Sequence, residues 1–410
     1  MSSRSTKITR KEVDRIRGDF PMLAVEMNGK PLVYLDSAAT SQKPRVMIDR
    51  LERLYSHEYA RPQEGYSLSK DATKAFEGVR QQVARLINAA DPAEIIFCRG
   101  ATEATNLAAR AVEHDRLGEG DEVLVTEAEH HSNIVPWLMA CHAKGARVRA
   151  VPITSSGDLD LDRLEPMLND RVRLLAVNHV SNVTGAVLPV EQATKLAHDR
   201  GIQVLVDGAQ AVPHLPVDVR AIGCDLYAGS GHKMGGPSSV GFLYGRKDVL
   251  EALPTAEGGS MMVGNVTFDE FEPKPPPQKY EAGEPAFGEV TSWGPAIEYW
   301  QKLGLDRIAA YERAIAREAA DALGQIERVR ILGAPTDRIA VVSFTVDGMP
   351  AKDVEQALDR EGIAVRAGTL ESQPQLRALG TEEAVRASFS FYNTSDEVTQ
   401  LATALSSIVA

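Results

Sequence analysis

The chain has 410 residues, 43% of them hydrophobic and 25% charged, with a formal net charge of −12. This size and composition are typical of a globular protein with two domains, and the negative charge argues against nucleic acid or an anionic membrane surface as a partner. No apolar run approaches the roughly 18 residues of a membrane span. The three cysteines are widely spaced and residues 1–10 lack the apolar core of a secretory signal, so we expect a cytoplasmic protein without disulfides or a metal site.

The first predicted element is a helix near residues 11–16. From about residue 90, short apolar runs alternate with helical stretches; the runs are 94–97, 122–125, 147–151, 173–177, 203–206 and 225–228. Runs of this kind are typical of buried parallel strands, so we predict a doubly wound α/β fold with a mostly parallel sheet. The run at 240–244 is predicted to add an antiparallel strand.

The pattern changes after residue 292. One long amphipathic helix is predicted over 296–323, followed by strands at 339–345, 363–365 and 386–390 and a helix near 351–360. We therefore predict a large domain at 31–292 and a smaller α+β domain at 293–410. Residues 1–30 are expected to pack on the smaller domain.

The most informative motif is Gly229-Ser230-Gly-His232-Lys233, preceded by a strand that ends in Asp207. Pyridoxal phosphate chemistry requires this arrangement. The lysine amine forms a Schiff base with the cofactor aldehyde, and the aspartate keeps the pyridine nitrogen protonated so that the ring accepts electrons. Ser230 and His232 are predicted to donate to the phosphate. The alternative for Lys233 is an ordinary exposed loop lysine.

Other polar residues follow neighbouring strands, at the edge where doubly wound sheets bind ligands. Thr102 lies at a helix start, where free N–H groups bind phosphate, although an ordinary helix cap is an equal alternative. His130 is placed to stack on the pyridine ring and act as acid or base, or to make a structural hydrogen bond. Asn182 is a candidate donor to the cofactor phenolic oxygen. Arg386 is a candidate for binding a substrate carboxylate, or a surface arginine in a salt bridge.

Taken in order, these motifs resemble class V aminotransferase-fold enzymes, and most closely the SUF-type (group II) cysteine desulfurases. The resemblance covers nearly the whole chain and includes 17–23, 34–39, 131–137 and 386–394. It implies the fold type I of pyridoxal-phosphate-dependent transferases, an amino-acid substrate, and a homodimer with active sites at the subunit interface. It also implies the following positions: Lys233 as the Schiff-base lysine, Asp207 and Gln210 under the ring, His130 over it, Asn182 at its phenolic oxygen, Ala101, Thr102, Ser230 and His232 at the phosphate, and Ala38 and Arg386 at the substrate.

One departure from the resemblance concerns the chemistry directly. A desulfurase uses a thiolate on a mobile loop to take sulfur from the substrate, and the matching stretch here, residues 366–374, has Glu371 at the nucleophile position. A carboxylate cannot form a persulfide, and Cys98, Cys141 and Cys224 are predicted to be small core residues. We therefore predict that the chain is not a standard desulfurase. Glu371 is a candidate acid/base or acceptor of a cationic group, or a solvated loop residue.

Three further departures surround the predicted site. Glu64 stands in a segment that is usually basic, and Ala101 replaces a phosphate-binding threonine. Glu284 replaces a threonine that reaches the partner subunit's cofactor phosphate, so Glu284 must turn away or pair with a cation. Glu64 and Glu371 together suggest a pocket that prefers a cationic or neutral distal group.

The favoured reaction is β-elimination of the C–S lyase type, with Lys233 moving the Cα proton. Aminotransferase and epimerase activities are alternatives, because this fold supports all three. A non-catalytic cofactor-binding partner protein and a desulfurase that uses an external thiol are the remaining hypotheses. The presence of Arg386 favours an enzyme, because a scaffold does not need a carboxylate-binding residue.

Overall fold

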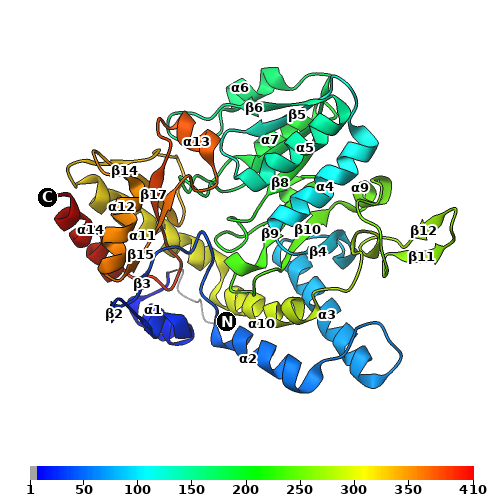
Figure 1. Ribbon diagram of the computed structural model, residues 1–410, viewed down its shortest axis with the longest axis horizontal. Coiled ribbons are helices and arrows are strands. Elements are labelled where there is room, and N and C mark those ends of the chain that lie inside the picture. Colours follow the sequence, from blue (N-terminus) through cyan, green and yellow to red (C-terminus); the bar gives the residue numbers. More distant parts are fainter. Residues whose placement is uncertain (1–6) are drawn as a thin grey trace.

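A computed structural model of the chain describes residues 7–410. Its central element is a seven-stranded sheet with the order β4-β10-β9-β8-β7-β5-β6 (Figure 1). The strands are β4 (Ile95–Cys98), β5 (Glu122–Thr126), β6 (Arg147–Val151), β7 (Val172–Asn178), β8 (Gln203–Asp207), β9 (Leu226–Ser230) and β10 (Gly241–Gly245). Strands β6, β5, β7, β8 and β9 are parallel, and β10 runs antiparallel between β9 and β4. The predicted sheet and its antiparallel strand at 240–244 are therefore confirmed.

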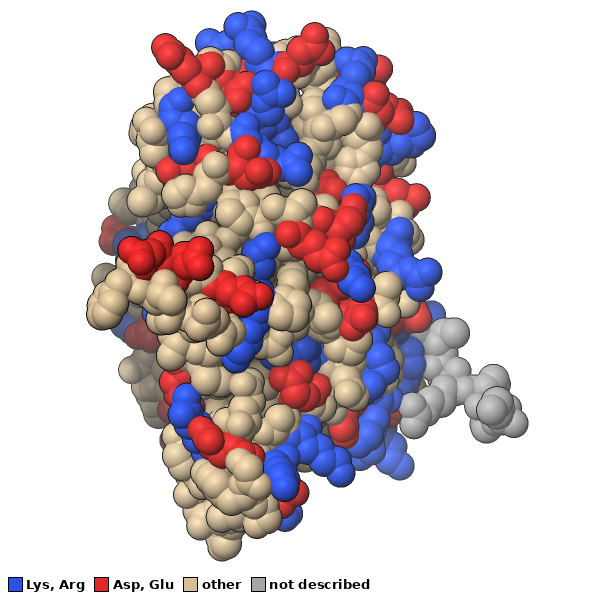
Figure 2. Space-filling view, turned by 90° about the vertical axis from the view of Figure 1, so that its right-hand side faces the viewer, with Lys and Arg blue, Asp and Glu red and all other residues tan. Residues whose placement is uncertain are grey.

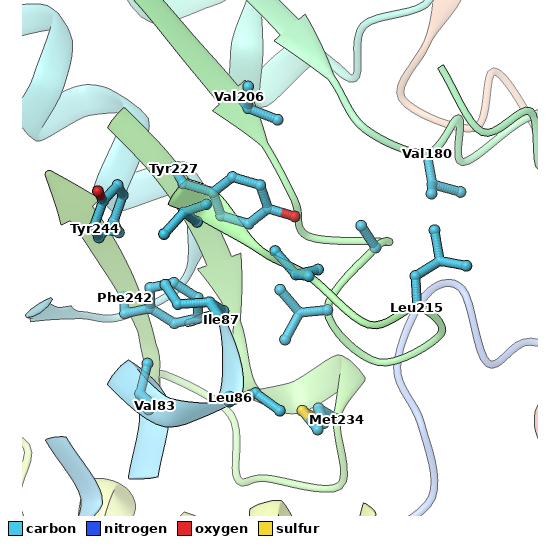
Figure 3. Close-up of a cluster of buried hydrophobic side chains, with 14 of the residues drawn as sticks. Val83, Leu86, Ile87, Val180, Val206, Leu215, Tyr227, Met234, Phe242 and Tyr244 are labelled. Atoms are coloured by element: carbon cyan, nitrogen blue, oxygen red, sulfur yellow. The ribbon is translucent and has the colours of Figure 1, made fainter. Parts of the chain in front are cut away.

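Alternating side chains of each central strand face opposite sides of the sheet, which gives two separate cores. Val123 and Val125 of β5 belong to the core that includes side chains of α4 (Ala101–Arg116) and α5 (Val135–Lys144). Leu124, between them, belongs to the core on the other face. In that second core, Phe242 and Tyr227 lie near Val83 at the end of α3 (Ser67–Leu86) (Figure 3).

The predicted burial of the strand at 147–151 is wrong. Strand β6 lies at the edge of the sheet, and of its five residues only Val151 is buried. An edge strand pairs with only one neighbouring strand and is less covered by other elements. Its apolar residues can therefore stay partly exposed.

Six further helices of the described residues belong to the part of the molecule that contains the large sheet. They are α2 (Arg45–Arg53), α6 (Leu161–Leu164), α7 (Val190–His198), α8 (Val219–Ile222), α9 (Lys247–Ala252) and α10 (Phe287–Leu303). A hairpin of β11 (Val263–Val266) and β12 (Phe271–Pro273) projects from this part of the molecule (Figure 1).

A smaller antiparallel sheet of order β13-β14-β17-β16 forms the other part of the molecule. Its strands are β13 (Val329–Ile331), β14 (Val341–Val346), β16 (Arg366–Gly368) and β17 (Ala384–Ser388), accompanied by α11 (Leu305–Gly324), α12 (Ala351–Arg360), α13 (Gln373–Ala378) and α14 (Ser395–Val409). The single helix predicted over 296–323 is wrong, because Gly304, with φ of 91°, ends α10 and precedes α11. The predicted domain limits stay a prediction; residue 293 lies inside α10.

The N-terminal segment contacts the smaller part of the molecule. Helix α1 (Arg10–Gly18) is tied to the start of α14 by an ion pair between Arg17 and Glu397 at 2.9 Å. Short strands follow, β1 (Glu26–Met27), β2 (Lys30–Pro31) and β3 (Val33–Tyr34), and β3 pairs in parallel with β15 (Ile363–Ala364). Residues 1–6 of the segment that was predicted to pack here lie outside the described residues.

Charged side chains of both signs are interspersed over the face in Figure 2. Within residues 7–410, no helix is both long and apolar enough to span a membrane.

Candidate active site

A cavity of about 190 Å³ lies where the parallel strands end. All twelve residues predicted for the site line it: Ala38, Ala101, Thr102, His130, Asn182, Asp207, Gln210, Ser230, His232, Lys233, Glu371 and Arg386. Seven further lining residues were missed by the sequence analysis: Ala39, Ser132, Asn178, Val180, Ala209, Arg366 and Leu370. The ends of parallel strands meet at one edge of a sheet, and this geometry brings the strand-end motifs together.

Lys233 and Asp207 form the charged centre of the cavity. Lys233 follows β9, and burial lowers the pKa of its amine to about 8, against the attraction of Asp207. Asp207 ends β8 and accepts a hydrogen bond from the Ala209 N–H at 2.9 Å, while burial raises the pKa of its carboxyl. The alternative of an exposed loop lysine is therefore wrong.

The cavity wall contains buried oxygen atoms that have no hydrogen-bond partner among the described residues. The Gln210 amide donates to the Ala38 carbonyl at 2.8 Å, but its own Oε1 is unpartnered. The Oδ1 atom of Asn178 is unpartnered as well. A buried polar atom without a partner is costly, so these atoms indicate a place for a polar ligand.

The start of α4 forms one end of the cavity. Gly100 precedes it with φ of 140° and leaves the helix without a side-chain cap, and the Ala101 N–H donates to the Ser230 hydroxyl at 2.9 Å. Thr102 and Ser132 share a hydrogen bond between their hydroxyls at 2.7 Å. An uncapped helix start with hydroxyl groups beside it suits a phosphate. The alternative of Thr102 as an ordinary cap does not hold, since Gly100 occupies the cap position.

His130 is held in one orientation. Its Nδ1 accepts a hydrogen bond from the Ser132 N–H at 3.1 Å, so the neutral ring carries its proton on Nε2. Burial, and then the charge of Lys233, lower the pKa of His130 to about 3. The ring is therefore neutral at physiological pH. Ser132 lies two residues after His130, but the sequence alone did not indicate its role.

A buried glutamate, Glu129, stabilises the segment of the cavity wall that carries His130. Glu129 accepts hydrogen bonds from the Asn178 N–H at 2.8 Å and from the Asn133 side chain at 2.7 Å. It therefore joins the end of β7 to the segment that carries His130. Burial raises the pKa of Glu129 to about 8.

Arg386 is buried, with 2% of its surface exposed, so the alternative of a surface arginine is wrong. Its Nη2 pairs with Asp36 at 3.0 Å and its Nη1 donates to the Asn182 carbonyl at 3.2 Å. Its Nε has no partner among the described residues. A guanidinium held on two sides with a donor to spare is suited to binding a carboxylate.

The loop that carries Glu371 is pinned to the cavity wall. The Asn182 amide donates to the Leu370 carbonyl at 2.9 Å, and the Ser372 hydroxyl donates to the Asn182 Oδ1 at 3.0 Å. The His131 N–H donates to the Glu371 carbonyl at 2.7 Å. The side chain of Asn182, predicted to contact the cofactor, thus makes its hydrogen bonds to this loop. Glu371 itself pairs with Arg366 at 3.3 Å.

The three cysteines are buried, as predicted. Burial raises the pKa of the Cys141 thiol to about 11 and that of Cys98 well above its usual value. None of the three lines the cavity in the described part of the chain. No group of three or more candidate metal ligands occurs in residues 7–410.

Two departures noted in the sequence meet at one surface arginine. Arg61 pairs with Glu284 at 3.0 Å and with Glu64 at 3.2 Å. Glu284 therefore pairs with a cation, which is one of the two predicted outcomes. Neither glutamate lines the cavity, so within one protomer Glu64 and Glu371 do not face the same ligand.

Residues 33–401 match the family "Aminotransferase class-V". The chain belongs to the class V aminotransferase family. It is 43% identical to a cysteine desulfurase of Synechococcus elongatus, covering 96% of this chain and 63% of the relative. It is also 43% identical to a cysteine desulfurase of Dickeya dadantii, covering 96% of both. Among solved structures, the cysteine desulfurase CsdA of Escherichia coli (S-sulfonic acid) has a TM-score of 0.89 at 36% identity, covering 96% of this chain and 97% of that one.

This chain therefore has the fold type I architecture and is a pyridoxal-phosphate-dependent enzyme of the class V family. The cavity fits the cofactor on its own evidence. Lys233 lies beside Asp207, the Gln210 Oε1 lacks a partner, and an uncapped helix start lies at one end of the cavity. The chain spans less than two thirds of the Synechococcus relative.

Proposed function

We propose that this enzyme is a β-eliminating C–S lyase that acts on an S-substituted L-cysteine, as a cytoplasmic homodimer. The observation that supports elimination is the pinned Glu371 loop together with three buried thiols. Sulfur transfer by the chain itself would need a thiolate that reaches the substrate. Elimination needs only a base at Cα and a leaving sulfur.

The cofactor, when bound, supplies an electron sink for the bonds at Cα. Asp207 would hold its ring nitrogen, while Ser230, His232 and the start of α4 would hold its phosphate. Because burial lowers the pKa of the Lys233 amine to about 8, a substantial neutral fraction exists near neutral pH. Neutral Lys233 would remove the Cα proton as general base.

The remaining residues orient the substrate. Arg386 would bind the α-carboxylate with its free donor, and its contact with Asp36 fixes the guanidinium plane. The neutral His130 would donate from Nε2 without adding a positive charge. In the overall reaction the Cα–H and Cβ–S bonds break, and one water is then consumed as it replaces the amino group by breaking the Cα–N bond. The products are a thiol, pyruvate and ammonium, and no oxidant or reductant is required.

Desulfurase activity with an external thiol is the second candidate, supported by the names of the relatives at 43% identity. Aminotransferase, epimerase and non-catalytic roles remain alternatives. The two leading candidates differ in their products from L-cysteine, because desulfuration leaves alanine and elimination leaves pyruvate.

The test measures alanine and pyruvate from L-cysteine and from S-ethyl-L-cysteine, with cofactor-loaded protein and with or without added dithiothreitol. We expect pyruvate from at least the S-ethyl substrate and no alanine. Alanine that depends on the added thiol would replace lyase with external-thiol desulfurase. Lys233→Ala should abolish every product, whereas product formation that survives it would rule out the assigned base.

Glu371→Cys is the sharpest variant for this question. If the missing thiol is what separates this enzyme from desulfurases, the variant should gain alanine formation from L-cysteine and carry a protein persulfide detectable by mass. The matched control is Glu382→Cys, which places a thiol on an exposed residue near the same loop but outside the cavity. An equal gain in both variants would contradict the proposed importance of position 371.

A further inference from the structure

Three charged side chains of the cavity wall come from two neighbouring strands and the loop beside them. Arg366 of β16 lies directly opposite Arg386 of β17 in the antiparallel register. Both line the cavity, together with Glu371. Arg386 is buried against Asp36, whereas Arg366 pairs with Glu371 at 3.3 Å. The site therefore contains one arginine for an α-carboxylate and, next to it, a separate ion pair.

The position of Glu371 in this ion pair is fixed by the backbone of its loop. Leu370 is buried, and both Leu370 and Glu371 have positive φ angles, 52° and 56°. Non-glycine residues adopt this conformation only where their surroundings stabilise it. Here the Asn182 side chain and the His131 N–H bind the two carbonyl groups at 2.9 and 2.7 Å. Glu371 is therefore fixed in place as part of the cavity wall.

The ion pair keeps hydrogen-bonding capacity toward the cavity. The side chains of Arg366 and Glu371 are 40% and 53% exposed, and one contact at 3.3 Å uses only one of the guanidinium N–H groups and one carboxylate oxygen. A ligand can thus bind to both side chains without separating them.

The charges of the pair determine which distal group suits the site. An anionic group would bind Arg366 but would approach the Glu371 carboxylate. A cationic group would bind Glu371 but would approach the guanidinium groups of Arg366 and Arg386. An alkyl group would leave the free donors and acceptors of the pair to water and would gain neither a hydrogen bond nor a charge contact there. A zwitterion that carries an ammonium and a carboxylate on one carbon presents both complementary charges.

We propose that the Arg366–Glu371 pair is a specificity site for a second amino-acid head group at the distal end of the substrate. The substrate class is a thioether that joins two alanyl units, with one carboxylate on Arg386 and the distal zwitterion on Arg366 and Glu371. This inference rests on the proposed lyase function of the same cavity. For lanthionine, elimination breaks one Cα–H and one Cβ–S bond, and one water then breaks the Cα–N bond of the same unit, giving cysteine, pyruvate and ammonium.

The experiment compares four L-cysteine thioethers that differ in distal charge. They are lanthionine (zwitterionic), S-(2-aminoethyl)cysteine (cationic), S-carboxymethylcysteine (anionic) and S-ethylcysteine (neutral). For each, kcat/KM for pyruvate and the dissociation constant for the cofactor-loaded protein are measured. Since a hydrogen bond to a charged group is worth enough for about a tenfold change or more, lanthionine should have a kcat/KM roughly tenfold higher, and a dissociation constant roughly tenfold lower, than each of the others.

Three variants of the pair and one control test the residues. Arg366→Met and Glu371→Gln should each reduce the preference for lanthionine over S-ethylcysteine about tenfold. Arg377→Met is the matched control, because Arg377 pairs with Glu382 at 3.1 Å outside the cavity and should leave the preference unchanged. A partial return of the preference in Arg366→Lys would show that the positive charge, and not packing, is responsible.

The failures of this inference and of the lyase function have different signatures. If pyruvate forms but any of the other three thioethers equals lanthionine, the inference is overturned and the lyase stands. If none of the four gives pyruvate, the lyase function fails, and the dissociation constants then test the distal site alone. Tenfold tighter binding of lanthionine would support the distal site, and equal binding of all four would overturn it.

Discussion

The side-chain amide of Asn182 donates a hydrogen bond to the carbonyl oxygen of Leu370 at 2.9 Å, across 188 positions of the sequence. This contact joins the loop after β7 in the large sheet to the loop after β16 in the small one. It fixes Glu371 at the rim of the cavity, because Glu371 is the next residue in that loop. The same asparagine accepts from the Ser372 hydroxyl, so two of its polar atoms serve this connection.

Asn182→Ala should loosen the loop. The buried carbonyl of Leu370 would lose its donor, which costs roughly 1–3 kcal/mol of unfolding free energy. Amide hydrogen exchange should therefore become faster at residues 370–373, with the rest of the small sheet unaffected. Asn265→Ala in the exposed β11–β12 hairpin serves as the control. Unchanged exchange at 370–373 would mean that other contacts hold the loop.

Thiol-directed reagents should have little effect on the folded enzyme. All three cysteines are buried, and burial raises the pKa of Cys141 to about 11, which leaves very little thiolate at neutral pH. Iodoacetamide should leave pyruvate formation essentially unchanged and add no mass to the native protein. The denatured protein should gain three adducts under the same conditions. Rapid inactivation that parallels a single adduct would point to a reactive thiol and to desulfurase chemistry.

The reaction of the cofactor-free protein with pyridoxal phosphate should depend on pH through Lys233. Burial lowers the pKa of this amine to about 8, and only the neutral amine attacks an aldehyde. The uptake rate should therefore rise with pH through a midpoint near 8, and fall at lower pH as the amine becomes charged. Nα-acetyl-lysine, measured in parallel, corrects for the titration of the cofactor itself. A midpoint near the ordinary lysine value would show that the amine is solvated.

The buried pair of His214 and Glu312 should be important for stability. The His214 Nδ1 lies 2.7 Å from a Glu312 carboxylate oxygen, and the pair connects the segment after β8 to α11. His214→Ala would remove a hydrogen-bond partner from the buried Glu312 carboxyl, at a cost of roughly 1–3 kcal/mol. The shift of the urea unfolding midpoint measures this cost, with His142→Ala on the exposed face of α5 as control. A shift no larger than that of the control would mean that the pair contributes nothing.

The amino-acid sequence by itself determined the α/β architecture and the cofactor. Apolar runs of strand length, each followed by a polar motif, specify parallel strands, and parallel strands bring their ends to one edge. That is why Asp207, Lys233 and His130, from three different strand ends, could be placed in one cavity before any contact was known. For these residues, local periodicity and chain topology are sufficient to predict the position in the fold.

Only the tertiary structure decided how the substrate side of the cavity is arranged. The pairing of Arg366 with Glu371, the burial of Arg386 against Asp36 and the use of Asn182 to hold a loop all depend on which side chains meet after folding. Such contacts depend on the distance and direction between distant segments, which neither hydrophobic period nor motif spacing encodes. The exposure of β6 has the same origin, because its place at the edge of the sheet decides it. The break at Gly304 is instead local, since a glycine with positive φ ends the helix there.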